Sequence, residues 1–403
     1  MSANRTARRR PRATLATCGT AHFLHDGFSD ALYVFLPLWA QAFGLSLTQV
    51  GVLKAVFTGA LAGFQLPSGF LAERLGERMV LAVGTVIAGL GFILLGFADG
   101  FYALIVCLLV AGLGCGTQHP LSSALVVHAF VNDTRRIALG MYNFTGDLGK
   151  VVVPALIAVG AATIGWRGSA IGYGTIGVVA ACAIFLVLKG LQAGVAPAPH
   201  TTLHTFTKRA RWGIRHRRGF ALLSVIAVID FSTRTGFLTF LPFLLIAKGA
   251  QVETVGLALA LVFGGGAAGK VLCGIGAARF GIIRTAVLTE LITGGGILLL
   301  VGISLVPALV LLPLVGFGLN GTSTVLYGTV AEFAAPERQS RAFGFFYTVG
   351  VGASALAPLV YGIASDLAGV PVTLVIVALV ALISIPLFPL LSASLATARE
   401  ELA

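Results

Sequence analysis

Charged residues are scarce in this sequence. Asp, Glu, Lys and Arg together make up 10% of the 403 residues, whereas a soluble domain carries roughly 25%. The hydrophobic share is 57% and the mean hydropathy is +0.97. So few charges cannot cover a surface that faces water, which excludes a soluble globular protein and indicates a membrane protein.

Signals of enzymes and metalloproteins are also missing. The five cysteines lie in apolar stretches without a CxxC spacing, so we interpret them as core residues. No HExxH or GxSxG motif is present. The stretch 264–270 resembles the start of a phosphate-binding P-loop, but Val271 stands where Ser or Thr is required. We therefore predict no enzyme, no ATP-driven pump, no cofactor and no metal site.

Long apolar stretches fill most of the chain. A helix needs about 20 residues to cross the ~30 Å hydrocarbon core of a membrane. Twelve stretches are long enough: Thr14–Phe43, Leu47–Leu71, Met79–Ala98, Phe101–Leu121, Ile137–Ile164, Ser169–Leu188, Phe220–Ala247, Val255–Ala278, Ala286–Leu305, Ala308–Val330, Ala342–Leu367 and Val372–Ser392. Glycine, at 52 residues, is frequent and allows close helix packing, with small-xxx-small spacings at Gly59/Gly63 and Gly112/Gly116.

The basic residues gather in alternate connections between these stretches. If the amino terminus is cytoplasmic, the outside segments contain only Arg167 and Lys248, and the other loop cations lie inside. The positive-inside rule then predicts a multi-pass protein of the bacterial inner membrane with both termini cytoplasmic. The net charge of +12 lies at helix ends without interleaved aromatics, so we expect contact with membrane lipids and not with nucleic acid.

The two halves of the chain match at a constant shift of 204 residues. The matched pairs are Asp26/Asp230, Gly112/Gly316, Gly114/Gly318, Gly140/Gly344, Gly146/Gly350 and Pro154/Pro358. We predict an all-α polytopic fold of twelve transmembrane helices in two pseudo-symmetric six-helix bundles, and the matches indicate an internal duplication. The predicted parts are a basic amino terminus (1–13), the first bundle (14–189), a linker (190–219), the second bundle (220–393) and the carboxyl terminus (394–403).

The short loop after the second stretch carries a recognisable pattern. It reads Gly69-Phe-Leu-Ala-Glu73-Arg74-Leu-Gly76-Glu-Arg78 and resembles the signature between the second and third helices of the major facilitator superfamily. The resemblance implies a cytoplasmic gate formed by Gly69, Glu73, Arg74, Gly76 and Arg78, with Glu73 in place of the usual aspartate. The second-half copy has Ala278 at that place, which predicts a weaker latch there.

A narrower resemblance lies in three further segments. They are His22-Phe-Leu-His-Asp26, the stretch from Pro37 through Phe43-Gly-Leu-Ser-Leu to Val50-Gly51, and His119-Pro120-x-Ser122-Ser123. These segments are similar to the fosmidomycin-resistance-type exporters. The resemblance implies a secondary transporter that exports a small organic compound, such as an anionic phosphonate. The arginine-containing motif of many drug/proton antiporters is absent from the fourth helix, where 108–112 is apolar.

Nine ionisable side chains fall inside the predicted spans, where a charge costs about 2.5–3.5 kcal/mol and is functional by default. In the superfamily, the first and seventh helices face each other. Asp26 and Asp30 lie on one helix face, as do Asp230 and Arg234, because each pair is spaced i, i+4. We predict that Asp26 and Asp30 carry proton coupling and that Arg234, Asp230 and Asp30 bind substrate.

Five other residues are secondary candidates for the site: His22, His119, Asp147, Lys150 and Lys54. Asp147 and Lys150 are three residues apart and can pair locally. Histidines near helix ends are often structural, and no metal spacing joins them. Lys270 and Glu290 lie towards helix ends, so we expect both to extend to the membrane surface.

Three functional hypotheses fit these features. The leading one is a proton-coupled exporter of a small organic compound, favoured by the intramembrane acids. The alternative is a facilitator or proton-coupled importer of an anionic metabolite, which buried cations would favour. The third is a membrane receptor that transports nothing. For a transporter we expect a small-molecule substrate, protons as coupling ions and a monomeric state.

Overall fold

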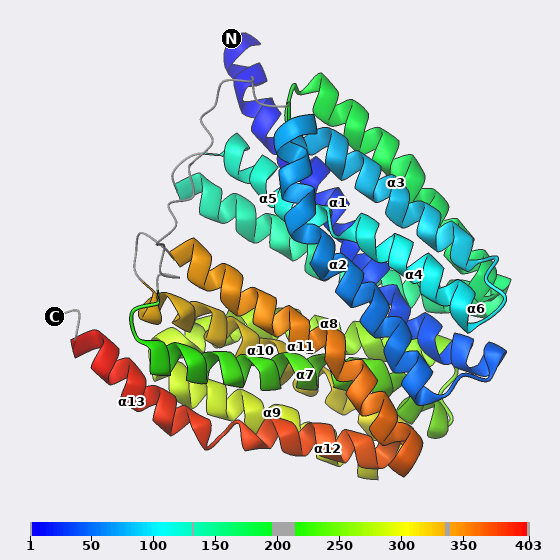
Figure 1. The fold of residues 1–403 in the computed structure, drawn as a ribbon, viewed down its shortest axis with the longest axis vertical. Helices are drawn as coiled ribbons and strands as arrows, with labels where there is room; N and C mark the ends of the chain where they lie inside the picture. Colours follow the sequence, from blue (N-terminus) through cyan, green and yellow to red (C-terminus); the bar gives the residue numbers. More distant parts are fainter. Residues whose placement is uncertain (1, 131–132, 196–213, 335–338, 401–403) are drawn as a thin grey trace. The chain divides into compact units, whose positions relative to one another are not determined.

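Helices form nearly all of the described structure (Figure 1). The computed structural model describes residues 2–130, 133–195, 214–334 and 339–400. The first six helices are α1 (Ser2–Phe43), α2 (Leu47–Leu75), α3 (Glu77–Leu95), α4 (Phe101–Cys115), α5 (Gln118–Ala129) and α6 (Asp133–Gly190). The others are α7 (Arg217–Ala247), α8 (Val252–Phe280), α9 (Ile282–Gly302), α10 (Leu305–Val330), η1 (Ala331–Phe333), α11 (Gln339–Ala368), α12 (Val370–Ile383) and α13 (Leu387–Glu400). The prediction of an all-α membrane fold is confirmed for these residues.

Ten helical stretches of the described residues are long and apolar enough to cross a membrane. The two predicted spans Ile137–Ile164 and Ser169–Leu188 both lie in α6, which Gly165 divides into two legs. Gly165 has φ 76° and ψ 161°, a left-handed φ that glycine adopts without steric cost. The first predicted span lies in α1, which is not one of the ten and carries Asp26 and Asp30 in its middle.

The helices divide into two compact units. Unit 1 comprises Met1–Leu45, Val56–Thr202 and Val252–Gly256, and unit 2 comprises Ser46–Ala55, Leu203–Gln251 and Leu257–Ala403. In unit 1, α6 packs on α1 and α3, and α1 also packs on α5. In unit 2, α7 packs on α10, α11 and α12, and α9 packs on α10 and α12. The predicted linker 190–219 falls largely on 196–213, outside the described residues, and α7 begins at Arg217.

Matched glycines occupy matching positions within the two units. Gly112 in α4 touches the backbone of α2, and Gly316 in α10 touches the backbone of α8. Gly114 faces α3, and Gly318 faces α9. A methyl group at any of these four positions would collide with the neighbouring helix, so each glycine permits a close helix crossing.

The first turn of α2 is held by a residue of α11 within unit 2. Asp366 accepts hydrogen bonds from the backbone N–H groups of Leu47 at 2.8 Å and Thr48 at 2.9 Å. The backbone N–H groups on either side are satisfied locally, because Ser46 N–H donates to Gln49 Oε1 and Gln49 N–H donates to Ser46 Oγ in a reciprocal capping box. A carboxylate at this place also complements the positive end of the helix dipole. Asp366 thus joins the first turn of α2 to α11 through two backbone hydrogen bonds within unit 2.

Asp366→Ala should free the two amides while the capping box still starts α2 at Leu47. Loss of a cap costs about 0.5–2 kcal/mol, and we expect the lower half of this range because Asp366 is exposed and water can replace it. Hydrogen exchange at Leu47 and Thr48 should become about threefold to fivefold faster. The matched control is Asp99→Ala, which removes another exposed acid. Equal exchange in both variants would show that the two hydrogen bonds add nothing to local stability.

Two cations close the ends of α3 and α9. Arg167 donates to the carbonyl oxygens of Gly96 at 2.9 Å and Ala98 at 2.7 Å. Lys248 donates in the same way to the carbonyl oxygens of Val301 and Ile303. A cation at the carboxyl-terminal end of a helix satisfies free carbonyls and complements the dipole. Both cations that the charge pattern assigned to outside segments therefore have a structural partner.

Candidate functional site

One buried carboxylate in unit 1 is the centre of a charged cluster. Asp26 on α1 is 4% exposed. Its Oδ2 lies 3.2 Å from Lys150 Nζ and 3.3 Å from His22 Nε2, and its Oδ1 lies 3.7 Å from His119 Nε2. The partners come from α6, α1 and α5. Sequence analysis named all four residues, and the structure brings them together around Asp26.

Packing of α6 against α1 makes this approach possible. Gly146 faces the cluster from α6, and a methyl group there would lie 2.5 Å from His22 Nε2 and 2.7 Å from Asp26 Oδ2. Any larger residue at this position would displace the histidine or the carboxylate. Gly146 was found in the sequence as one of the pairs at a shift of 204 residues, but its place beside Asp26 follows only from the structure.

The hydrogen bonds of His22 fix where its proton lies. The ring Nδ1 is 2.9 Å from the carbonyl oxygen of Tyr142. A carbonyl only accepts, so Nδ1 carries the hydrogen and a neutral ring presents a lone pair at Nε2. That lone pair faces Asp26 Oδ2, which also only accepts when ionised. The contact is favourable when a proton lies between the two atoms, so His22 and Asp26 form a pair suited to hold one proton.

The ring of His22 is held in place by its neighbours. It stacks on the ring of Tyr142, with centroids 4.2 Å apart, and meets His119 edge-on at 5.1 Å. The Tyr142 hydroxyl accepts a hydrogen bond from Gln118 at 2.9 Å. Tyr142 and Gln118 were not predicted from the sequence. Tyr142 contributes a backbone carbonyl and Gln118 a neutral amide, and neither residue is a charged group within an apolar stretch.

Lys150 is shared between two carboxylates. Its Nζ lies 3.7 Å from Asp147 Oδ1, so the predicted local pair is present, but the distance to Asp26 is shorter at 3.2 Å. The cluster thus combines two acids with three basic side chains. An anion that enters can take Lys150 while one carboxylate releases it.

A metal ion was not predicted here, although three side chains have suitable donor atoms. The donor atoms of His22, Asp26 and His119 lie within 4.8 Å of one another. The ammonium group of Lys150 occupies the same carboxylate and would repel a cation. We therefore assign no metal to the cluster. His25 belongs to another contact, since its Nε2 lies 2.8 Å from Thr85 Oγ1 of α3.

Asp30 and Lys54, the other candidates from the first two helices, are also buried. Asp30 lies one turn after Asp26 on α1 and is 8% exposed. Lys54 is 4% exposed and belongs to unit 2 through the segment Ser46–Ala55. Both residues have interaction partners.

Unit 2 contains a second set of buried polar groups. Asp230 on α7 is 3% exposed and accepts a 2.6 Å hydrogen bond from Ser323 on α10. Arg234, one turn later on α7, is half-buried. Among ion pairs of the described residues, none within 4.0 Å includes Arg234. The expectation that Glu290 extends to the membrane surface is wrong, because this side chain is 2% exposed.

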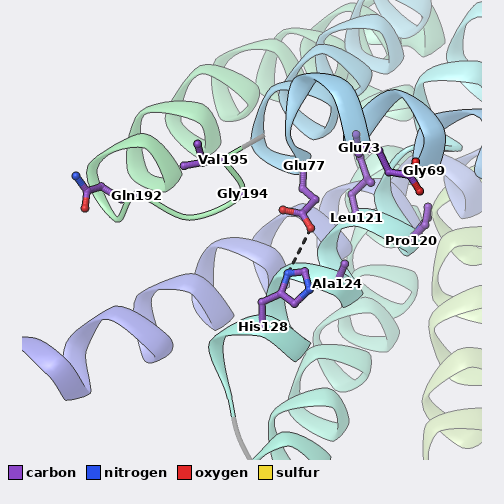
Figure 2. A pocket seen from close by; sticks show the side chains of 11 residues that line it. Gly69, Glu73, Glu77, Pro120, Leu121, Ala124, His128, Gln192, Gly194 and Val195 are labelled. Carbon is purple, nitrogen blue, oxygen red and sulfur yellow. Dashed lines mark ion pairs between the residues drawn. The ribbon is translucent and has the colours of Figure 1, made fainter. Parts of the chain in front are cut away.

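The proposed gate loop lies beside a hollow of unit 1. Gly76, with φ 83°, separates α2 from α3, and both Glu73 and Arg74 are exposed. Glu73 and Glu77 line a hollow of about 480 Å³, and Figure 2 shows both side chains. Glu77 forms an ion pair with His128 at 3.3 Å. The Glu77–His128 pair had no signal in the sequence, because neither residue belongs to the apolar part of a span.

Two further gate residues connect this hollow to neighbouring segments. Gly69 lines the hollow from α2. The backbone N–H of Arg78 donates to the carbonyl oxygen of Gly194 at 3.3 Å, which joins the start of α3 to the segment that follows α6. The gate itself stays a prediction.

The fold and the cluster define a class of protein, a multi-pass all-helical membrane protein with ionisable side chains buried among its helices. The model of the Major Facilitator Superfamily matches residues 18–312 and 223–401. The chain belongs to this superfamily. It is a transporter and not an enzyme, and its substrate is a small molecule.

Similar proteins agree with this assignment. A probable sulfoacetate transporter of Cupriavidus necator is 26% identical over 82% of this chain and 81% of its own length. A probable L-galactonate transporter of Escherichia coli is 26% identical over 58% of this chain and 54% of its own. The fosmidomycin resistance protein of Escherichia coli is 25% identical over 39% of each chain, so the narrower resemblance covers much less of the sequence.

Solved structures share the fold at low sequence identity. A bacterial homolog of the human lysosomal transporter Spinster, solved in an inward-facing and unoccupied conformation, superposes with a TM-score of 0.82. The match covers 96% of this chain and 98% of that chain at 15% identity. This similarity supports the fold alone.

Proposed function

We propose that this protein is a proton-linked permease for a small organic anion in the bacterial cytoplasmic membrane. The observation that carries the proposal is the buried cluster of unit 1, in which Lys150 is shared by Asp26 and Asp147 beside two histidines. Uptake of a proton removes the excess negative charge of the two carboxylates over the one ammonium group, so Lys150 becomes available to a carboxylate or sulfonate.

The substrate anion and the proton bind together in this mechanism. An anion that pairs with Lys150 takes the counter-ion from Asp26. Asp26 then becomes more favourable as a proton acceptor, and His22 is placed to share that proton. Because each binding step strengthens the other, anion and proton move in the same direction. We propose Arg234 and Asp230 as the corresponding groups of unit 2, with Asp30 as a further acid on α1.

Relatives support an anionic substrate. Sulfoacetate and L-galactonate, which appear in the names of two similar transporters, carry sulfonate or carboxylate groups. The second candidate function is the export of such a compound by proton exchange, which the resemblance to the fosmidomycin resistance protein favours.

We also propose twelve membrane spans from an internal duplication. The number follows from the ten apolar stretches, with α6 counted as two spans because Gly165 divides it, and with α1 added. The matched glycine contacts of the two units support the duplication. We propose that both termini are cytoplasmic, which the basic connections support, and that Glu73 and Arg74 form a cytoplasmic gate.

Transport by purified protein in lipid vesicles tests the proposal. Sulfoacetate, galactonate, an uncharged sugar and an organic amine serve as probes, after a thermal-shift screen of all four. We expect an anion to accumulate when the outer solution is more acidic than the lumen. Accumulation only into an acidic lumen would instead support exchange and export. Transport of the amine or the sugar, with no transport of either anion, would refute an anion permease. If a compound stabilises the protein in the thermal-shift screen but no compound crosses the vesicle membrane, the result would favour a receptor.

A further inference from the structure

A hollow of about 990 Å³ lies in unit 2, where the start of α7 meets α11. Among the described residues that line it are two arginines, Arg215 and Arg217, and no acid. Apolar side chains, including Phe220, Phe345 and Val349, form most of the remaining lining. The α7 hollow therefore combines two permanent positive charges with an apolar wall.

The backbone that carries the two arginines is fixed within unit 2. The backbone N–H of Arg215 donates to the carbonyl oxygen of Phe333 in η1 at 2.9 Å. The ring of His216 stacks on the ring of Phe333, with centroids 5.9 Å apart, and its Nδ1 accepts a hydrogen bond from the backbone N–H of Gly219 at 3.0 Å. Because the main chain is already ordered, binding a ligand here would restrict only the two side chains.

Both guanidinium groups are available to an anion. Arg215 and Arg217 are exposed, and none of the ion pairs within 4.0 Å that the described residues form includes either of them. Arg167 and Lys248 differ in this respect, since carbonyl oxygens at helix ends accept their hydrogen bonds. The charge of the α7 hollow is therefore complementary to a negatively charged ligand.

The apolar wall distinguishes between kinds of anion. Phe220 on α7 and Phe345 on α11 have ring centroids 5.9 Å apart. Phe220 is 3% exposed, whereas Phe345 is 39% exposed and presents apolar surface to the same hollow. A small free anion would use the guanidinium groups and leave this wall in contact with water. A phospholipid has both a phosphate for the arginines and hydrocarbon chains for the wall.

We propose that the α7 hollow binds an anionic phospholipid, with Arg215 and Arg217 on its phosphate and Phe345 against an acyl chain. The arginines lie just before Phe220, where the predicted seventh span begins. In the proposed orientation this is the cytoplasmic surface, where basic pockets between transmembrane helices bind lipid headgroups. The planar guanidinium group suits a phosphate because it donates two parallel hydrogen bonds. This site goes beyond the proposed permease and shares no residue with the cluster around Asp26.

Native mass spectrometry of the full chain with added lipid tests the site. The probes are phosphatidylglycerol and phosphatidylcholine with the same acyl chains. We expect the wild type to bind one phosphatidylglycerol about tenfold more tightly than phosphatidylcholine. Replacing Arg215 and Arg217 together by Gln should weaken phosphatidylglycerol binding by about tenfold or more. Equal binding of the two lipids by the wild type would overturn the proposal.

A matched control removes two cations outside the hollow. Arg218 and Arg284 are exposed residues of unit 2 and do not line it, so replacing both by Gln should leave the affinity for phosphatidylglycerol unchanged. All four arginines are exposed, and each variant should unfold at the wild-type temperature in lipid-free detergent. The same loss of affinity in both double variants would show a general effect of surface charge and would contradict a site at the α7 hollow.

A further variant distinguishes a lipid from a free anion. Phe345→Ala removes part of the apolar wall and keeps both arginines, so it should weaken phosphatidylglycerol binding about threefold to tenfold. Inorganic phosphate in excess should not displace the lipid from the wild type. Displacement by phosphate, with unchanged lipid affinity in Phe345→Ala, would show a site for free anions and overturn the lipid site. None of these measurements uses transport, so a negative result leaves the anion permease intact.

Discussion

Lys150→Met is expected to weaken anion binding by about 30-fold or more. Truncating one member of a buried charge pair costs about 2–5 kcal/mol, and each ~1.4 kcal/mol is a factor of ten. The variant also leaves Asp26 buried without its nearest ammonium group, which lies at 3.2 Å. Binding is measured by calorimetry or thermal shift with the anion that the wild type transports.

Two controls separate binding from folding. Lys189→Met removes an exposed lysine at the end of α6 and should leave affinity unchanged. Adding Asp26→Asn to Lys150→Met removes the unpaired acid, so it should restore protein yield without restoring affinity. Full affinity in Lys150→Met would show that the ammonium group only balances Asp26 and Asp147, and the anion site would have to be sought elsewhere.

Asp26→Asn should abolish proton-driven accumulation, with a loss of at least a hundredfold, while exchange of labelled for unlabelled anion persists. The amide keeps the shape of the carboxyl group but cannot take up the proton that Asp26 would share with His22. His22→Gln should give a smaller loss and a changed pH profile, because Asp26 remains. The measurement compares accumulation under an imposed pH gradient with exchange at equal pH. Accumulation that is unchanged in Asp26→Asn would exclude this residue from coupling.

The sequence could name the charged residues of the site but not their arrangement. Asp26, His119 and Lys150 come from three different helices. A charged residue within an apolar stretch can be recognised in the sequence because its burial in the membrane costs free energy, but the sequence does not show which other residues it meets. Their convergence depends on the packing of α1, α5 and α6, which Gly146 permits. Helical periodicity does separate His22 from His25, because only His22 is spaced i, i+4 from Asp26 and shares its face.

Other errors arose where tertiary packing decides the outcome. Its position towards a helix end suggested that Glu290 reaches the membrane surface, but α9 packs on α10 and α12 and Glu290 is 2% exposed. Gly59 and Gly63 share their spacing with Gly112 and Gly116, yet only the second pair meets the backbone of another helix. The spacing of the glycines shows that a second helix could approach closely. It does not show whether a helix lies at that position.

Arg167 and Lys248 differ in whether the carbonyl groups that they bind are synthesised before or after the cation itself. Arg167 follows Gly96 and Ala98 in the chain, so its acceptors already exist when it emerges. Lys248 precedes Val301 and Ile303 by 53 and 55 residues. Domains generally fold from the amino terminus during synthesis. The end of α3 can thus be closed while translation continues, whereas the end of α9 stays open until its own last turn has been translated.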